Sequence, residues 1–172
     1  MGEIDRFRGQ LLKLLSGALD VAQVEELKCL LRSIAASDFV GELPTKVASD
    51  PKRGYGRVQL FREARAELAL VVLQPGQRIR PHDHGDYGAH TEVEPVVGLV
   101  HVFRGQELNR FYTLNDGASL EETGCRVIRA GEFLELSPTI IHSVENPGEV
   151  TAASLHAYIY AQEDPATKKR RF

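Results

Sequence analysis

The most constraining feature of this chain is a series of short apolar segments, separated by turn residues, that begins after residue 50. The segments are rich in valine, leucine, isoleucine and aromatic residues: YGRVQLF, AELALVVL, VVGLVHVF, LNRFYTL, CRVIRA, GEFLELS, IIHSV and AASLHAYIY. Glycine, proline, asparagine and aspartate separate them, at 75–76, 104–105, 115–117, 130–131 and 146–148. Many short strands with regular turns predict an antiparallel sandwich or a small barrel.

The N-terminal part has a different periodicity. Residues 5–16 and 20–36 place leucine, isoleucine and valine three and four positions apart, which predicts two amphipathic helices. Asp20 stands before the second helix with Gln23 three positions later, as in a capping box. We therefore expect one mainly β domain over residues 1–172. It would have a helical part over 1–48 with two to three α-helices, a barrel over 50–160 and a basic tail over 161–172.

Composition and charge narrow the class of protein. The 172 residues are 42% hydrophobic and 26% charged, which is typical of a globular domain with a sizeable core. The formal net charge of −3 provides no global positive field for nucleic acid. The basic run at 168–171 is expected to be a solvated chain end.

Other features of the sequence concern its location in the cell. No stretch approaches the roughly 18 consecutive apolar residues that cross a bilayer. The first residues mix charges into their apolar pattern, unlike a signal peptide. Cys29 and Cys125 lie far apart in the sequence and are expected to be reduced, structural thiols. We expect a cytoplasmic protein, monomeric or homodimeric, that binds neither nucleic acid nor membranes.

Three of the six histidines lie within nine positions, and two of them, His82 and His84, are one residue apart. Because side chains alternate along a strand, both imidazoles are expected on the same side of it. Taken alone, such a pair is also typical of solvent-exposed or hydrogen-bonded histidines. A third histidine on that side would complete a set of three imidazoles, which suits a non-haem Fe(II) site with open coordination positions. The candidates are His90, His101, His142 and His156.

Two segments, GQRIRPHDH and GEFLELSPTIIHSVEN, resemble the two sequence motifs of the cupin superfamily. In the first segment, Gly76 is followed by five residues and then by His82, Asp83 and His84. The resemblance implies a cupin-type, jelly-roll-like barrel in which the two histidines bind a metal.

The second segment places Gly131, Pro138, His142 and Asn146 in the order of the second motif, with one residue fewer than usual between the proline and the histidine. The resemblance makes His142 the third metal ligand. The pairing of the two motifs, rather than the first alone, supports a metal site.

Many cupins add a glutamate ligand, which would stand seven residues before Gly105. This chain has Gly98 there, and Glu92 and Glu94 are out of register. A cupin with three histidine ligands and no glutamate resembles the thiol dioxygenases of the cysteine dioxygenase family.

That resemblance covers roughly residues 50–160 and includes residues beyond the ligands. Ser154, His156 and Tyr158 match the family's Ser-x-His-x-Tyr strand, which implies that the serine and histidine orient the tyrosine hydroxyl. YGRVQLF is similar to the strand that supplies an arginine for the substrate carboxylate, which would be Arg57 with Tyr55 beside it.

Two features depart from the family pattern. Gly98 stands where the animal enzymes have a cysteine that crosslinks to the tyrosine, so Tyr158 is expected to stay unmodified. The segment over 85–97, which includes His90, is longer than usual and is expected to line or cover the pocket.

The resemblance implies an Fe(II)-dependent enzyme that converts a small thiol carboxylate and O2 to a sulfinic acid. The substrate is cysteine or a mercapto-acid such as 3-mercaptopropionate. The alternatives are a metal-dependent cupin enzyme of another class and a non-enzymatic cupin that binds a small molecule. Arg57 is alternatively a surface ion-pair residue, and His156 and Tyr158 are alternatively ordinary core side chains. His90 and His101 are expected not to be ligands.

Overall fold

The computed structural model describes residues 2–15, 20–63, 65–83, 95–116, 119–137 and 139–160. Within them it contains the helices α1 (Glu3–Leu14), α2 (Val21–Ala35) and α3 (Asp38–Lys46). The strands are β1 (Gly56–Glu63), β2 (Ala66–Leu73), β3 (Arg78–His82), β4 (Pro95–Arg104), β5 (Gln106–Leu114), β6 (Leu120–Arg129), β7 (Phe133–Leu136), β8 (Ile141–Glu145) and β9 (Ala152–Tyr160).

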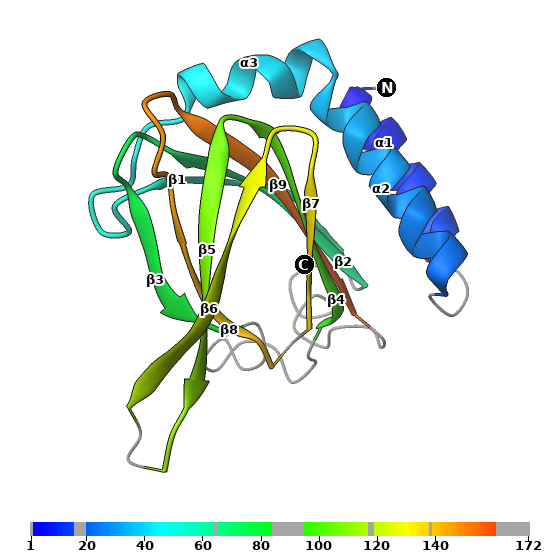
Figure 1. Ribbon diagram of the computed structural model, residues 1–172. Helices are drawn as coiled ribbons and strands as arrows, with labels where there is room; N and C mark the ends of the chain where they lie inside the picture. The colour runs from blue at the N-terminus through cyan, green and yellow to red at the C-terminus, as the bar shows by residue number, and fades with distance from the viewer. Residues whose placement is uncertain are drawn as a thin grey trace.

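The strands form two antiparallel sheets that face each other as the two walls of a barrel (Figure 1). One sheet has the order β1-β2-β9-β4-β7 and the other has the order β3-β8-β5-β6. Apolar side chains from both sheets meet between them, including Val71 and Val102 from the first and Val144 and Ile128 from the second. The prediction of a mainly β barrel with two to three N-terminal helices is confirmed.

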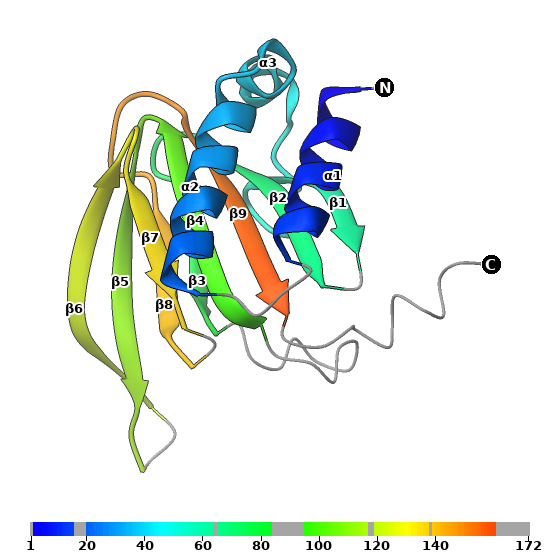
Figure 2. The same ribbon diagram turned by 90° about the vertical axis from the view of Figure 1, so that its right-hand side faces the viewer.

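Helices α1 and α2 lie along the outer face of the five-stranded sheet (Figure 2). Their apolar stripes pack against the residues of β2, β4 and β9 that point outward. Polar contacts at the rim fix the position of α2, where the Lys28 ammonium lies 2.7 Å from the Glu135 carboxylate of β7. The Arg32 guanidinium lies 4.7 Å from the centre of the Phe133 ring. This outer face is therefore closed by the protein's own helices.

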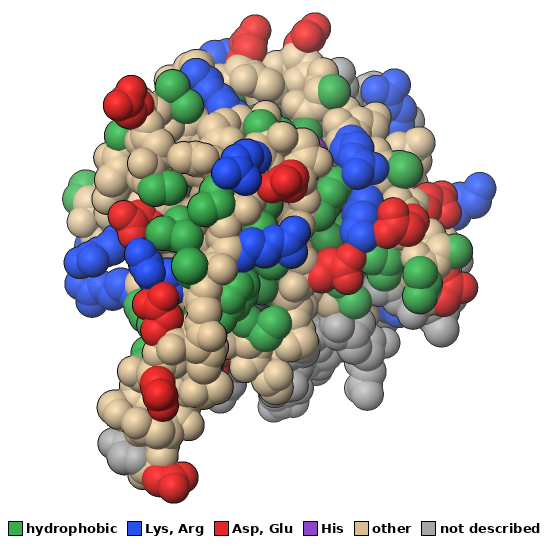
Figure 3. Space-filling view, in the orientation of Figure 1, with side chains coloured by type: hydrophobic (Ala, Val, Ile, Leu, Met, Phe, Trp, Pro, Cys, Tyr) green, Lys and Arg blue, Asp and Glu red, His purple; other side chains and the backbone are tan. Residues whose placement is uncertain are grey.

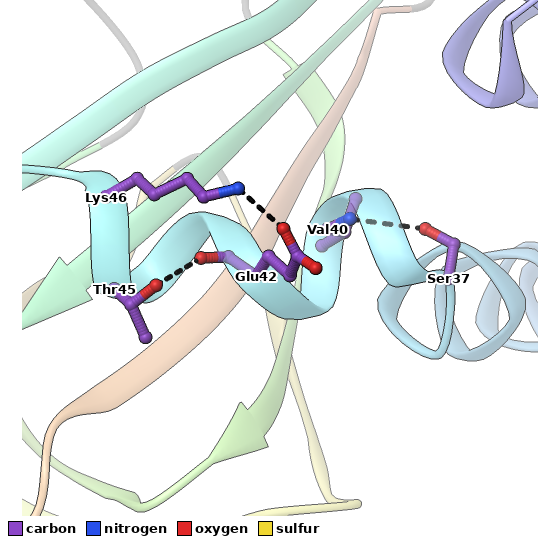
Figure 4. A network of polar contacts seen from close by, with 5 residues as sticks. All are labelled: Ser37, Val40, Glu42, Thr45 and Lys46. Carbon is purple, nitrogen blue, oxygen red and sulfur yellow. Dashed lines mark hydrogen bonds and ion pairs between the residues drawn. The ribbon is translucent and has the colours of Figure 1, made fainter.

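Helix α3 is defined by local contacts rather than by a long apolar stripe (Figure 4). The Ser37 hydroxyl accepts a hydrogen bond from the Val40 backbone N–H at 3.3 Å and caps the first turn. Lys46 pairs with Glu42 at 2.5 Å, one turn apart. The segment includes Pro44. In a nine-residue helix with an internal proline, the spacing of apolar residues is a weak signal. The sequence therefore predicted α1 and α2 more clearly than α3.

The surface agrees with the composition. Positive and negative side chains are interspersed over the face shown in Figure 3. Cys29 and Cys125 are both exposed and free, so the predicted thiols form no disulfide, although neither is part of the core. Among the helices in the described residues, none combines the length and apolar character needed to cross a bilayer.

Candidate active site

The inner wall of the four-stranded sheet carries two of the three predicted metal ligands side by side. His82 at the end of β3 is paired with His142 on β8, and the centres of their rings are 4.7 Å apart. His142 is fully buried, and the Phe111 ring on β5 stacks over it. His84 lies outside the described residues, so its role as the remaining ligand stays a prediction.

The hydrogen bonds of the two rings fix which nitrogen each offers to a metal. The Nδ1 atom of His142 lies 2.9 Å from the side-chain oxygen of Asn109, and that of His82 lies 2.8 Å from the Arg80 carbonyl oxygen. Because these oxygens only accept hydrogen bonds, each Nδ1 donates, and Nε2 of the neutral ring carries the lone pair. Burial lowers the pKa of His82 and favours the neutral form that ligates a metal.

These observations test whether the chain fits the iron that the sequence predicts. Two neutral imidazoles, each with Nδ1 held by an oxygen acceptor, are the form in which histidine binds iron. Within the described part of the chain, no three histidine, cysteine or acidic side chains gather into a metal-binding set. The third ligand of the prediction, His84, falls in the segment that the structure leaves undescribed. His82 and His142 fit Fe(II), and His84 would complete the predicted set of ligands.

The opposite wall carries Ser154, His156 and Tyr158 on alternate positions of β9. The Ser154 hydroxyl lies 2.9 Å from Nε2 of His156, and Nδ1 of His156 lies 3.2 Å from the Tyr158 hydroxyl. Ser154 and His156 are both buried. The structure thus brings the predicted residues into one hydrogen-bonded chain, which we call the β9 relay. Their catalytic roles remain predictions.

Gly98 on β4 is paired directly with Tyr158 on β9. A Cβ atom at this position would lie 3.6 Å from Cδ1 of the Tyr158 ring and 3.2 Å from Cβ of Leu136. A side chain at this position would therefore touch the Tyr158 ring. Glycine leaves the ring without such a neighbour.

Arg57 takes part in an ion pair, as its alternative interpretation proposed, although the partner, Glu67, was not predicted. Its guanidinium contacts the carboxylate of Glu67, which is 6% exposed, and Arg62 lies 3.5 Å from the same carboxylate. Glu67 is paired with Tyr158 across β2 and β9, so the cluster adjoins the β9 relay. Two arginines and one glutamate leave a net charge of +1. Tyr55 is half-buried against the apolar cluster at the β3 side of the barrel.

His101 lies on the other side of the five-stranded sheet. Its ring stacks on Phe133 at a centroid distance of 4.3 Å, and its Nδ1 lies 3.2 Å from the Glu132 carbonyl oxygen. Burial lowers the pKa of His101, which favours the neutral ring. That His101 is not a metal ligand stays a prediction. His90 and most of the longer segment over 85–97 lie outside the described residues.

Asn146, the last residue of the second motif, has a structural role in the turn after β8. Its amide donates to the carbonyl oxygens of Leu73 at 2.9 Å and Val150 at 2.8 Å, and its oxygen accepts from the Gly148 N–H at 2.9 Å. These bonds fasten the turn after β8 to the end of β2, which fixes the strand that carries His142.

Sequence reasoning missed two polar residues inside the barrel, Asn109 and Glu107, both on β5 and both 1% exposed. Burial raises the pKa of the Glu107 carboxyl to about 7, and the nearby Ser154 hydroxyl partly offsets this shift. Neither carboxyl oxygen of Glu107 has a partner with good hydrogen-bond geometry. The available signal was the alternation in β5, which puts both residues on the same face as the apolar Phe111.

No family model matches the chain. Solved structures similar to it include a cupin 2 conserved barrel domain protein from Salinispora arenicola CNS-205, with 17% identity and a TM-score of 0.49 over 72% of this chain and 86% of that one. An oxalate oxidase in complex with the substrate analogue glycolate has 22% identity and a TM-score of 0.49, over 74% of this chain and 63% of that one. Peruvianin-I, a cysteine peptidase from Thevetia peruviana latex, has 15% identity and a TM-score of 0.49.

The alignment with peruvianin-I covers 66% of each chain. The chain thus spans less than two thirds of the length of both peruvianin-I and the oxalate oxidase. Peruvianin-I and the oxalate oxidase have different activities, and each comparison is one of overall fold at low identity.

Proposed function

We propose that this protein is an Fe(II)-dependent thiol dioxygenase that converts a small thiol carboxylate and O2 to the sulfinic acid. The observation that carries the proposal is that two sets of polar side chains lie on opposite walls of one barrel. One wall presents the His82 and His142 rings in the tautomer that binds a metal, and the other presents the β9 relay, which ends at the Tyr158 hydroxyl.

In this proposal His82, His84 and His142 hold the iron. The bound Fe(II) supplies the centre at which a thiolate and dioxygen react. Asn109 holds Nδ1 of His142 and so fixes the orientation of that ring.

The substrate carboxylate is bound by Arg57, whose guanidinium is suited to two-pronged contact. Glu67 holds this side chain in place, and Arg62 leaves the cluster with a net positive charge that attracts an anion. Tyr55 stands two residues before Arg57, and in this proposal it lies beside that arginine at the substrate-binding site.

The Tyr158 hydroxyl serves as the polar group beside the reacting sulfur. His156 and Ser154 orient it through hydrogen bonds of 3.2 Å and 2.9 Å. Because Gly98 has no side chain, the tyrosine acts without a covalent link at that position.

The direct test is oxygen uptake by the full chain, purified without oxygen and loaded with Fe(II). The thiols to compare are cysteine, 3-mercaptopropionate, mercaptosuccinate and cysteamine. We expect uptake with at least one carboxylate thiol and weaker uptake with cysteamine, which has no carboxylate. Absence of uptake with every thiol would contradict the proposal.

A second candidate is a barrel that binds a small molecule without oxidising it. The observation that favours it is the Arg57–Glu67 ion pair, which is complete without any substrate. This candidate predicts that a mercapto-acid raises the melting temperature equally with and without iron and that no oxygen is consumed. Thiol-dependent oxygen uptake would exclude it.

A further inference from the structure

Strand β6 is the last strand of the four-stranded sheet, and within the described residues it forms a ladder with β5 alone. The hairpin of these two strands projects beyond the rest of the barrel (Figures 1 and 2). The residues over 120–126 are all exposed. The outer edge of β6 therefore presents backbone N–H and C=O groups with which a further strand can pair.

This edge differs from two of the other edge strands. β7, at one end of the five-stranded sheet, has only four residues, and β3, at the other end of the four-stranded sheet, contains Pro81. A short strand and a proline both limit pairing with a further strand. β6 has ten residues and no proline, so neither of these two features protects it.

A bulge in β6 determines how its residues are counted along the ladder. Gly124 is paired with Phe111, and Glu122 is paired with the next residue of β5. Thr123 is therefore an extra residue on β6 that has no partner on β5.

Counted along this ladder, an acid and a base lie at equal distances on the two sides of Gly124. Arg126 is paired with Asn109 and Glu121 with Thr113, which are two residues to either side of the β5 partner of Gly124. Because alternate residues of β5 point to the same side, the two charged residues and the glycine share one side of the sheet.

The other side of β6 has an apolar pair with the same symmetry. Val127 and Leu120 are paired with Leu108 and Leu114, each three ladder positions from the glycine. Leu120 is 43% exposed and Leu114 is 61% exposed. A two-fold rotation about Gly124 therefore exchanges an acid with a base on one side of β6 and one apolar residue with another on the other side.

The two charges are available for a partner. Within the described residues neither Glu121 nor Arg126 has an ion-pair partner, whereas Glu122 pairs with Arg110 at 3.1 Å. A Cβ atom added to Gly124 would meet no atom within 4 Å, so the centre of the strand is open on that side.

We propose that β6 pairs antiparallel with β6 of a second copy of this chain, about a two-fold axis at Gly124. Glu121 of each copy then lies opposite Arg126 of the other, and Leu120 lies opposite Val127. The same surface is used on both copies, as a two-fold dimer requires. Main-chain hydrogen bonds supply the affinity, and the opposite charges set the direction and register of the pairing.

The contact is one strand from each copy, which is small for a protein interface, so we expect a dissociation constant in the micromolar range. No proposed metal ligand and no residue of the β9 relay takes part in it. The inference therefore does not rest on the proposed function.

The first test is sedimentation velocity of the full chain over a series of protein concentrations, without iron or thiol. We expect a reversible dimer with twice the 19.1 kDa mass of one chain. Added salt should weaken the association, because exposed charges are screened.

Charge reversal tests the pairing itself. Arg126→Glu sets acids opposite one another at two symmetric places and should raise the dissociation constant by about tenfold or more. Glu121→Arg should have the same effect, and the double variant should associate again because it restores opposite charges. Lys52→Glu is the matched control, since it makes the same change in net charge as Arg126→Glu at an exposed residue in the turn before β1. Circular dichroism confirms that each variant is folded.

Amide hydrogen exchange locates the interface. Above the dissociation constant, backbone amides of residues 120–127 should exchange more slowly in the wild type than in Arg126→Glu at the same concentration.

A monomer at every concentration would overturn the inference, because the bulge and the charges would then protect a free edge. A dimer that Arg126→Glu and Lys52→Glu affect equally would do the same, as would a double variant that stays monomeric. A dimer in which the β6 amides gain no protection would place the interface elsewhere and also overturn it.

Discussion

The two faces of strand β9 differ in the residues they bury and in what covers them. The residues that point outward pack under α1 and α2: Leu155, Ala157 and Ile159. The residues that point inward form the polar relay: Ser154, His156 and Tyr158. Both faces are largely buried. The outward face is apolar, whereas the inward face carries hydrogen-bonding groups.

This contrast separates stability from chemistry within a single strand. The outer face gains free energy from apolar area removed from water. The inner face keeps polar groups that hydrogen-bond to one another, and burying such groups is costly unless they are hydrogen-bonded. Substitutions at adjacent positions of β9 should therefore have different consequences.

The largest effect is expected for the histidines on opposite sides of the barrel wall. Replacing His142 by alanine removes a proposed iron ligand, so stoichiometric Fe(II) binding should be lost, with a dissociation constant raised by more than about a hundredfold. His101→Ala is the matched control, because it removes a buried histidine from the outer face. Iron content by metal analysis checks both, and equal retention in the two variants would place the metal elsewhere.

The next effect compares adjacent residues of β9. Leu155 is 0% exposed, and Leu155→Ala should lower the free energy of unfolding by about 2–5 kcal/mol because it opens a cavity under the helices. Ser154→Ala removes one hydroxyl and should cost about 1 kcal/mol. Denaturant unfolding measures both values. Iron binding should survive Leu155→Ala; if iron binding were lost while the variant stayed folded, the two faces would not be separable.

Glu107 makes stability depend on pH. Its pKa rises from 4.5 to about 7 on folding, so the folded state holds this proton more tightly than the unfolded state does. Stability should therefore fall as the pH rises from about 4.5 to about 7 and stay level above, by about 3 kcal/mol in total.

The matched measurement is the free energy of unfolding of Glu107→Gln against the wild type, at about pH 4 and about pH 8. The variant has no carboxyl to ionise, so its stability relative to the wild type should rise over this interval by about 3 kcal/mol. Parallel curves would mean that Glu107 does not titrate as its burial requires.

The smallest effect concerns the inner rim at Arg57. Arg57→Ala should raise the KM for carboxylate thiols by about tenfold or more, with little change for cysteamine. Arg53→Ala is a suitable control, because this arginine lies in the preceding turn and pairs only weakly, at 3.7 Å, with Asp50. Steady-state oxygen uptake measures both. Equal losses for all thiols would give Arg57 a purely structural role with Glu67.

The sequence predicted the elements that repeat a simple pattern. Short apolar runs between turn residues such as glycine predicted strands including β2 and β9, because strand propensity and turn chemistry are both local. Gly76 and Gly131 indeed adopt positive φ angles of 74° and 93°. The position of His142 opposite His82 followed from the two motifs.

The polar contacts inside the barrel could not be predicted from sequence patterns. Alternation assigns Asn109 and Glu107 to one face but does not say that this face is the interior. The Arg57–Glu67 pair joins adjacent strands through a register that shifts at a bulge between Gln59 and Phe61, which no local signal reveals. Such contacts depend on strand pairing and therefore needed the three-dimensional structure.

The central claim is that the inner wall transfers both atoms of dioxygen to a thiol. Incubating the Fe(II)-loaded full chain with 18O2 and its best thiol carboxylate, followed by mass spectrometry of the product, tests this claim directly. The expected product is a sulfinic acid that carries two 18O atoms, formed in equal amount to the oxygen consumed. A disulfide as the main product, or a sulfinic acid with oxygen from water, would contradict it.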